Sequence, residues 1–264
     1  MGKLDGKVAY ITGAAMGIGE GIARVLAEHG AHVLLADISD EVFNTAKSIE
    51  AEGNEATAYK VDVTRSEEVK KSVDDALKKY EKIDILVNNA GVSKKRINFL
   101  ETSDEFRDFH FNVNINGVWN CTKVILPNMI KQKYGKIVII SSVTGTMVAD
   151  EGQVTYATTK AAVLGFTKAL AREVAKDNIN VNAICPGYIM TPLVKRVASK
   201  LDPGNPQSVI DGIASTIPMG RLGKVEEIGE LAAFLSSDES SYITGTQIVI
   251  DGGSTLPETV STKI

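Results

Sequence analysis

A tyrosine and a lysine one helical turn apart are the residues of this sequence whose types and spacing best suit proton transfer. Tyr156 and Lys160 end the stretch "SSVTGTMVADEGQVTYATTK". Residues at positions i and i+4 of a helix share one face. A protonated lysine there favours the phenolate, so we expect the pKa of Tyr156 to fall from its ordinary value of about 10. A tyrosine tuned in this way gives or takes a proton near neutral pH.

The same stretch begins with a serine pair, Ser141 and Ser142, at the end of a predicted strand over Lys136–Ser141. One hydroxyl there could hydrogen-bond a substrate oxygen and stabilise charge in a transition state. Side chains alternate along a strand, so only one of the two serines can face the site. A lone Tyr-x-x-x-Lys pattern also occurs on ordinary helix faces, so other motifs must show whether this pair is catalytic.

A glycine-rich turn near the N-terminus, in "VAYITGAAMGIGEGIARVLAEHGA", predicts a nucleotide site between a strand and a helix. Glycines allow the backbone to approach a pyrophosphate closely, and the helix N-terminus supplies free N–H groups. A turn without a ligand is the alternative. The expected contacts are Gly13, Met16, Gly17, Ile18 and Gly19.

Asp37 follows the second predicted strand, in "HVLLAD". A carboxylate there accepts hydrogen bonds from ribose hydroxyls and repels a 2′-phosphate. The glycine turn itself offers no Arg or Lys to hold such a phosphate. We therefore expect NAD as the cofactor, with NADP less favoured. The alternative is that Asp37 caps the helix that begins near Asp40.

Two more strand ends carry polar residues and tight turns, in "YKVDVT" and "VNNAG". Asp62 could cap a helix or hydrogen-bond an adenine amino group, and Gly91 permits close approach of a ligand. The carboxyl ends of successive strands are where open α/β sheets bind ligands. The expected cofactor contacts are Asp62, Val63, Asn89, Ala90 and Gly91.

Short apolar runs alternate with longer amphipathic ones along the chain. Near-continuous apolar runs predict strands buried on both faces, and the alternation predicts a parallel sheet. We expect an α/β fold with one Rossmann-like, doubly wound, seven-stranded parallel sheet and helices on both faces, as a single domain over residues 1–264. The predicted strands are Val8–Thr12, His32–Ala36, Ala56–Val61, Ile83–Asn88, Lys136–Ser141, Asn180–Ile184 and Gln247–Ile250. The predicted helices are Ile18–His29, Asp40–Glu52, Glu67–Tyr80, Asp104–Ile130, Tyr156–Lys176 and Val225–Leu235.

The least regular part of the chain lies within residues 187–223 and is rich in proline and glycine. Long irregular stretches inside a domain are usually functional. We interpret this one as a substrate lid containing a short helix, Pro206–Ser215, because regular patterns resume after it. The tail Ser254–Ile264 has no recognisable pattern.

Composition narrows the range of partners. The net charge of −4 gives no indication of nucleic-acid binding. No apolar run is long enough for a signal peptide or a membrane span. The two cysteines, Cys121 and Cys185, lack metal-ligand spacing and fit a reducing cytoplasm. We therefore expect a cytoplasmic protein with no membrane partner and no metal.

Taken together, these motifs resemble the short-chain dehydrogenase/reductase family. The matching pieces are "TGAAMGIG", "NNAG", Asn114 in "NVNINGV", the serine pair before Tyr156 and Lys160, and Pro186–Gly187 followed by Thr191. They stand in the family's order over nearly the whole chain. Stretches such as "NAICPGYIMTP" look more particularly like a bacterial subgroup, the UcpA-type oxidoreductases.

The resemblance implies roles for the matching residues. Tyr156 would be the general acid and base, and Lys160 would lower its pKa and hold the nicotinamide ribose. Ser142 would polarise the substrate carbonyl or alcohol, Asn114 would join a proton relay through water, and Asn88 would support the central strand. Further cofactor contacts would be Pro186, Gly187, Ile189 and Thr191.

The expected activity is NAD(H)-dependent interconversion of a secondary alcohol and a ketone, on a sugar derivative, a steroid or bile acid, or a hydroxy acid. The basic run Lys94, Lys95 and Arg96 could attract an anionic substrate or form an ordinary exposed loop. A ketoreductase of carrier-bound 3-oxoacyl chains and a non-catalytic nicotinamide-nucleotide sensor are the alternatives. The resemblance also implies a homotetramer, with a dimer as second choice.

Overall fold

A computed structural model describes residues 2–256 and contains one sheet of seven parallel strands in the order β3-β2-β1-β4-β5-β6-β7. The strands are β1 Val8–Thr12, β2 His32–Asp37, β3 Ala56–Lys60, β4 Ile85–Asn88, β5 Gly135–Ile140, β6 Ile179–Pro186 and β7 Gln247–Ile250. Each differs from its predicted range by at most two residues at either end. The predicted sheet, with its near-continuous buried strands, is confirmed.

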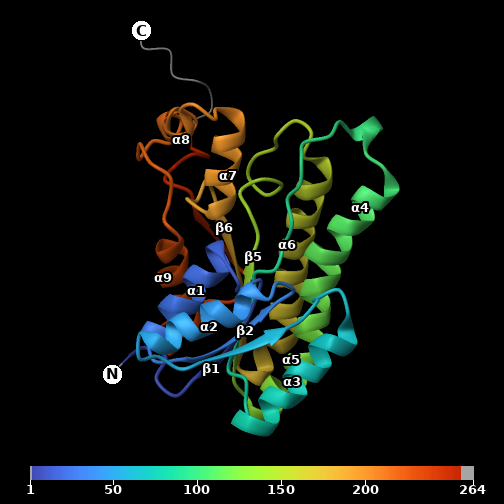
Figure 1. The fold of residues 1–264 in the computed structure, drawn as a ribbon. Helices are drawn as coiled ribbons and strands as arrows, with labels where there is room; N and C mark the ends of the chain where they lie inside the picture. Colours follow the sequence, from blue (N-terminus) through green and yellow to red (C-terminus); the bar gives the residue numbers. More distant parts are fainter. Residues whose placement is uncertain (1, 257–264) are drawn as a thin grey trace.

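Helices cover both faces of the sheet (Figure 1). One apolar core lies between the sheet and the helices α1 Gly17–Glu28, α2 Glu41–Ala51 and α9 Val225–Ser236. A second core lies on the opposite face, beneath α3 Ser66–Tyr80, α5 Gly117–Gln132 and α6 Val154–Val174. The doubly wound, Rossmann-like prediction is therefore confirmed.

The strand order reverses beside β1, which pairs with β2 on one side and β4 on the other. Ile11 is in register with Leu35 on β2 and with Val87 on β4. The connections that leave β1 and β4 therefore run to opposite faces of the sheet. Such a switch point opens a crevice at the carboxyl ends of the strands, where ligands bind in this class of fold.

The helix predicted over Asp104–Ile130 is interrupted. It consists of α4 Asp104–Phe111, a π-helical turn η2 at Asn112–Asn116, and α5. A π-helical turn holds one more residue than an α-helical turn and is frequent at functional sites. Its central residue, Asn114, is 2% exposed. The interruption thus lies at a residue that the sequence had already marked.

The segment predicted to be a lid contains two helices. The expected helix is present as α8 Pro206–Ser215, and a second helix, α7 Pro192–Leu201, precedes it. Both lie beyond the end of β6 in Figure 1. The segment is closed at its base, because Gly223 N–H donates to Tyr188 O at 2.9 Å and Met190 N–H donates to Gly223 O at 2.8 Å.

The remaining described elements are short, and most of the predicted tail lies outside the described residues. The short helices are η1 Phe99–Glu101, η3 Ala175–Asp177 and η4 Asp238–Ser240. Residues 252–255 form the turns after β7, whereas 257–264 are beyond the described range. Within residues 2–256, no helix combines the length and the apolarity that crossing a membrane requires.

Candidate active site

The glycine turn after β1 is as tight as its sequence suggested. Gly13 has φ +66°, and a Cβ on it would lie 2.8 Å from Ala90 Cα. A Cβ on Gly19 would lie 2.0 Å from Gly13 O. No side chain caps the first turn of α1, whose N-cap residue is Met16. The N–H groups there, including those of Gly17 and Ile18, are thus available to an anion such as a pyrophosphate.

Thr12 and Asn89 lock this turn to the end of β4. Asn89 Nδ2 donates to Thr12 O and to Gly13 O, both at 2.9 Å. Thr12 Oγ1 accepts hydrogen bonds from the N–H groups of Asn89 and Ala90, both at 3.0 Å. The sequence identified Asn89 and Ala90 as contacts, whereas Thr12 appeared only as the first residue of the "TGAAMGIG" stretch and was given no role.

Asp37 lies at the rim of the glycine turn. Its carboxylate accepts hydrogen bonds from Ala15 N–H at 3.0 Å and from Ser39 N–H at 2.9 Å. Helix α2 begins at Glu41, with Asp40 as its N-cap residue. Asp37 therefore does not cap α2, and its carboxylate is held in one orientation beside the turn.

Asp62 and Val63 follow β3. Asp62 Oδ1 accepts hydrogen bonds from Thr64 N–H at 2.9 Å and from the Thr64 hydroxyl at 2.8 Å, which shapes the turn before α3. Val63 packs against the start of α5, since a Cβ on Gly117 would lie 2.7 Å from Val63 Cγ2. Asp62 does not cap α3, whose N-cap residue is Arg65, so the helix-cap alternative is wrong. The second carboxylate oxygen of Asp62 lies 3.8 Å from Arg65 Nε.

The serine pair follows β5, which ends at Ile140, and so does not form part of the strand as predicted. Ser141 is buried, and its hydroxyl donates to Lys160 O at 2.9 Å. Ser142 Oγ accepts a hydrogen bond from Thr144 N–H at 3.1 Å, and its hydroxyl lies near enough to the Tyr156 phenol to lower the pKa of that phenol. The two serines thus point to different partners, and Ser142 is the one beside the tyrosine.

Tyr156 and Lys160 both lie in the first two turns of α6. Lys160 Nζ donates to Ile140 O at 2.8 Å and lies 5.7 Å from the centre of the Tyr156 ring. Burial lowers the pKa of Lys160 to about 8, although the neighbouring Cys185 opposes this effect. The ammonium therefore remains mostly protonated at neutral pH.

The pKa of Tyr156 differs from the expectation. Burial raises it above the ordinary value, and the hydrogen bond from Ser142 only partly offsets that rise. The expected fall is wrong for the protein without ligands, because removal of water from the phenolate outweighs the local stabilisation. The phenol thus holds its proton throughout the neutral range.

Asn114 joins three elements at the bottom of the site. Its Oδ1 accepts from Val92 N–H at 2.7 Å, and its Nδ2 donates to Val92 O and to Thr159 Oγ1, both at 3.0 Å. A Cβ on Gly91 would lie 3.4 Å from Asn114 Oδ1 and 3.5 Å from Lys160 Nζ. Asn114, Gly91 and Lys160 therefore form one cluster.

Asn88 is buried next to this cluster but turns away from it. Its Nδ2 donates to Thr122 Oγ1 on α5 at 3.0 Å. This bond ties the end of β4 to the helix that covers it, in agreement with the supporting role that the family resemblance implied.

The end of β6 completes the crevice. Pro186 O accepts a hydrogen bond from Val143 N–H at 3.1 Å, and Gly187 N–H donates to Ile250 O at 3.0 Å. Ile189 is buried and bridges to Gly223. Thr191 caps α7 by accepting from Val194 N–H at 3.3 Å. A Cβ on Gly17 would lie 3.8 Å from Thr191 Cγ2, so the first residues of α1 and α7 face each other.

Two of the three residues in the basic run already have partners. Lys94 Nζ lies 3.8 Å above the centre of the Phe109 ring, and Arg96 lies 3.7 Å from a carboxylate oxygen of Asp150. The Asp150 carboxylate offsets the charge of Arg96, whereas the Phe109 ring covers one side of the Lys94 ammonium and leaves its charge in place. No cluster of three or more histidine, cysteine, aspartate or glutamate residues suited to a metal occurs within residues 2–256.

Comparison with known proteins agrees with this geometry. The model of a family described as "Enoyl-(Acyl carrier protein) reductase" matches residues 13–255. An oxidoreductase UcpA from Salmonella typhimurium is 56% identical over 264 residues, which is the full length of both chains. The chain belongs to the short-chain dehydrogenase/reductase family. The predicted resemblance to UcpA-type oxidoreductases is confirmed as well.

Other members of the family differ in what they are named for. A 3-oxoacyl-[acyl-carrier-protein] reductase FabG from Thermotoga maritima is 43% identical over 253 residues, covering 95% of this chain and 98% of the relative. The crystal structure of levodione reductase superposes with a TM-score of 0.90 at 32% identity, covering 96% of this chain and 99% of that one. Membership of this family shows that the protein is an oxidoreductase that uses a nicotinamide cofactor.

Proposed function

We propose that this family member is an NAD(H)-dependent oxidoreductase that interconverts a secondary alcohol and a ketone. The observation that carries the proposal is the contact of the Tyr156 phenol with the Ser142 hydroxyl, one helical turn from the buried Lys160 ammonium. A proton donor, a second hydroxyl and a fixed positive charge are what carbonyl reduction requires at the oxygen atom.

The crevice suits a dinucleotide. The uncapped N-terminus of α1 would take the pyrophosphate, and the glycine turn leaves no side chain in its way. The oriented carboxylate of Asp37 would receive ribose hydroxyls and repel a 2′-phosphate, which supports NAD over NADP. The other expected contacts, from Asp62 and Val63 to Thr191, line the same carboxyl edge of the sheet. When bound, NAD supplies the hydride chemistry of the reaction.

The protein's own residues handle the proton. In reduction, the Tyr156 phenol gives its proton to the carbonyl oxygen as that oxygen becomes negative, and in oxidation the phenolate takes the proton back. The backbone N–H of Thr144 occupies a lone pair of Ser142 Oγ, so the Ser142 hydroxyl is oriented to donate to the same oxygen. Lys160 stabilises the phenolate and would hold the nicotinamide ribose, while Asn114 would connect the site to a water relay.

The substrate is proposed at the level of chemical class. A neutral sugar derivative or steroid fits a site without a free cationic cluster at its mouth. A bile acid and a hydroxy acid both carry a carboxylate and are supported less, because Lys94 and Arg96 are engaged by Phe109 and Asp150. Residues 187–223 would act as the lid over the substrate.

A second candidate is reduction of carrier-bound 3-oxoacyl chains. It is supported by the 43% identity to the FabG of Thermotoga maritima. A carboxylate at Asp37 argues against it where that reaction uses NADPH. The non-catalytic sensor is the least supported alternative, because Asn114, Ser142, Tyr156 and Lys160 are all present and lie close together.

We also propose a cytoplasmic homotetramer. Trp119 on α5 is 54% exposed and packs against Phe166 on α6, with their ring centres 5.7 Å apart. The two rings border an apolar hollow of about 310 Å³ between these helices. Burying such a surface against a second copy would stabilise an assembly with closed symmetry. Light scattering of the purified protein tests the number of subunits.

The decisive experiment for the activity is NADH formation from NAD⁺ over a panel of sugars, polyols, hydroxysteroids and hydroxy acids, with NADP⁺ in parallel. Turnover of one class with NAD⁺, lost in Tyr156→Phe, is the expected result. Preference for NADP⁺ would contradict the role given to Asp37. Binding of NADH without turnover of any alcohol or ketone would support the sensor instead.

A further inference from the structure

We propose that Thr159 is a positioning residue that fixes the proton-transfer pair of α6 to the π-helical turn η2. Its side chain is fully buried, at 0% exposure. The hydroxyl donates to Tyr156 O at 2.8 Å and accepts from Asn114 Nδ2 at 3.0 Å. A single oxygen atom therefore joins the backbone of the predicted acid to a residue on another helix.

The Asn114 end of this hydrogen bond is specific because the side-chain amide oxygen and both amide N–H bonds of Asn114 have partners. Its oxygen is taken by Val92 N–H, and one of its N–H bonds is taken by Val92 O. The second N–H bond is the one that reaches Thr159. Only a side chain with a lone pair at that point can accept this bond, so serine should replace threonine and valine should not.

The position of Thr159 in the chain makes the link relevant to chemistry. It lies directly before Lys160 and three residues after Tyr156. A small shift of this first turn of α6 would move the phenol away from Ser142 and the ammonium away from Ile140 O. Catalytic geometry is sensitive to shifts on the order of 1 Å, which can cost about a hundredfold in rate.

The same helix provides a matched control. Thr167 is 1% exposed, and its hydroxyl donates to Val163 O at 2.7 Å, also one turn back along α6. This side-chain hydrogen bond stays within the helix. Valine at either position removes a buried hydroxyl that donates one turn back, but only Thr159→Val also leaves the Asn114 N–H without an acceptor. Thr159→Val should therefore lose more thermal stability, and rates are compared on variants of equal folded fraction. Any difference in rate between them isolates the bond to Asn114.

The inference rests on the proposed function, so the test has one readout with a substrate and one without. The first is steady-state reduction with NADH and the ketone of the substrate found by the panel. We expect kcat of Thr159→Val to fall about tenfold to a hundredfold. The KM for the ketone and the Kd for NADH should stay within about twofold of the wild-type values. Thr159→Ser should restore kcat, and Thr167→Val should keep it.

The second readout is the ultraviolet titration of the Tyr156 phenol, taken as the difference between each variant and the same variant with Tyr156→Phe. Loss of the Ser142 contact would move the titration midpoint of Thr159→Val to higher pH, whereas Thr167→Val would match the wild type. This measurement needs neither cofactor nor substrate.

Each outcome has a defined meaning. Equal kcat in Thr159→Val and Thr167→Val, or an unchanged Tyr156 titration in Thr159→Val, would overturn the positioning role. Full activity of Tyr156→Phe would instead overturn the proposed function. Absence of turnover in the wild type would overturn the proposed activity. In that case the Tyr156 titration alone would test the positioning role of Thr159.

Discussion

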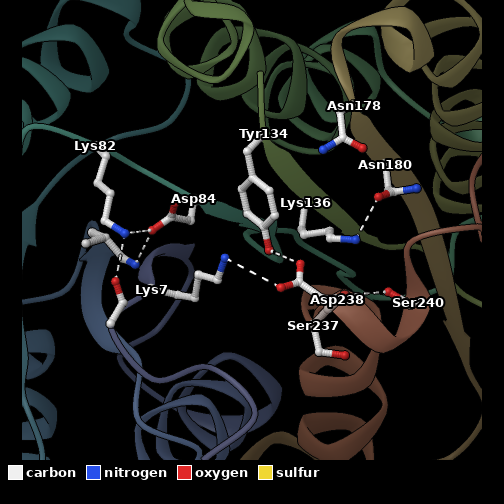
Figure 2. A network of polar contacts seen from close by, with 12 residues as sticks. Lys7, Lys82, Asp84, Tyr134, Lys136, Asn178, Asn180, Ser237, Asp238 and Ser240 are labelled. Carbon is white, nitrogen blue, oxygen red and sulfur yellow. Dashed lines mark hydrogen bonds and ion pairs between the residues drawn. The ribbon is translucent and has the colours of Figure 1, made fainter. Parts of the chain in front are cut away.

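A buried lysine lies at each end of β5, Lys136 in the strand itself and Lys160 on α6, and only Lys160 belongs to the candidate site. At the amino-terminal end, Lys136 is 2% exposed and donates to Asn180 Oδ1 at 2.7 Å (Figure 2). At the carboxyl-terminal end, Lys160 is 7% exposed and donates to Ile140 O. Burial lowers the pKa of both ammonium groups. Burial and a lowered pKa therefore do not by themselves mark a catalytic lysine.

The surroundings of the two lysines differ. Near Lys136, the Tyr134 hydroxyl donates to Asp238 at 2.9 Å, and Lys7 lies 3.8 Å above the Tyr134 ring and 4.0 Å from Asp238 (Figure 2). These polar groups satisfy one another. Both lysines have a phenol nearby, with Lys136 Nζ 5.9 Å from the Tyr134 ring centre and Lys160 Nζ 5.7 Å from that of Tyr156. The Tyr134 hydroxyl is taken by Asp238, whereas Tyr156 and Lys160 lie beside the bare backbone of Gly91. A catalytic lysine is distinguished by a titratable neighbour in a space that a ligand can enter.

The largest expected effect separates the two lysines by activity. Tyr156→Phe and Lys160→Met should each lower kcat about 100-fold to 10,000-fold, because both remove a part of the proton transfer. Lys136→Met should keep kcat close to the wild-type value. Steady-state kinetics on variants of equal folded fraction provides the check. A comparable loss in Lys136→Met would remove the distinction between the two ends of β5.

The second largest expected effect is the pH dependence of the unfolding free energy that Lys160 causes. The pKa of Lys160 is about 8 in the folded protein and 10.5 for an ordinary lysine. The folded state therefore bears the full cost of a buried charge below about pH 8, and this cost disappears as pH rises toward 10.5. Relative to Lys160→Met, the wild type should gain about 2 to 3 kcal/mol in unfolding free energy between about pH 7 and about pH 10.

Urea unfolding of both proteins at the two pH values measures this gain. A pH-independent difference between them would mean that Lys160 is not desolvated as described. Lys136→Met should show a dependence of the same sign, because the pKa of Lys136 is also lowered.

The third comparison is between Asp37 and Asp238, in their effect on the preference for NAD⁺ over NADP⁺. Asp37→Asn should weaken the discrimination against NADP⁺ by about tenfold, since about 1.4 kcal/mol of repulsion is a reasonable share for one charge near a ribose phosphate. Asp238→Asn, at the opposite edge of the sheet, should leave the preference unchanged. The ratio of kcat/KM for the two cofactors is the quantity to compare. An unaltered ratio in Asp37→Asn would place cofactor selection elsewhere.

The smallest expected effect concerns the amino-terminal network. Tyr134→Phe removes the bond to Asp238 and should cost about 1 kcal/mol of stability, as for a typical single hydrogen bond. Because Asp238 is 73% exposed in its side chain, water can replace the lost donor and limit the cost. Turnover should not change. A loss of activity in Tyr134→Phe would indicate that the two ends of β5 are energetically coupled.

Much of this fold could be predicted from the sequence because its strands are buried on both faces. Runs such as "KIVII" need no knowledge of their neighbours to be recognised as strands. Helix α7 was missed even though Thr191 and Pro192 form a standard start, an N-cap residue followed by proline. The number of prolines around it obscured this local signal.

The candidate site was predictable as a set of residues but less so as a set of contacts. Motif spacing identified Asn114 and Lys160, whereas the bond from Asn114 to Thr159 depends on how two helices pack. The direction of the Tyr156 pKa was missed for a related reason. A lysine four residues away is visible in the sequence, but the burial that outweighs it is a property of the fold.

The closed base of residues 191–222 has a consequence for how such proteins diversify. Gly223 N–H donates to Tyr188 O and Met190 N–H donates to Gly223 O, so the intervening chain leaves and rejoins the rest of the protein at neighbouring residues. Changes in the length and sequence of this segment therefore leave the register of the sheet strands unchanged. Relatives with different substrates could arise by exchanging this module alone, with the nucleotide crevice and the proton-transfer residues inherited intact.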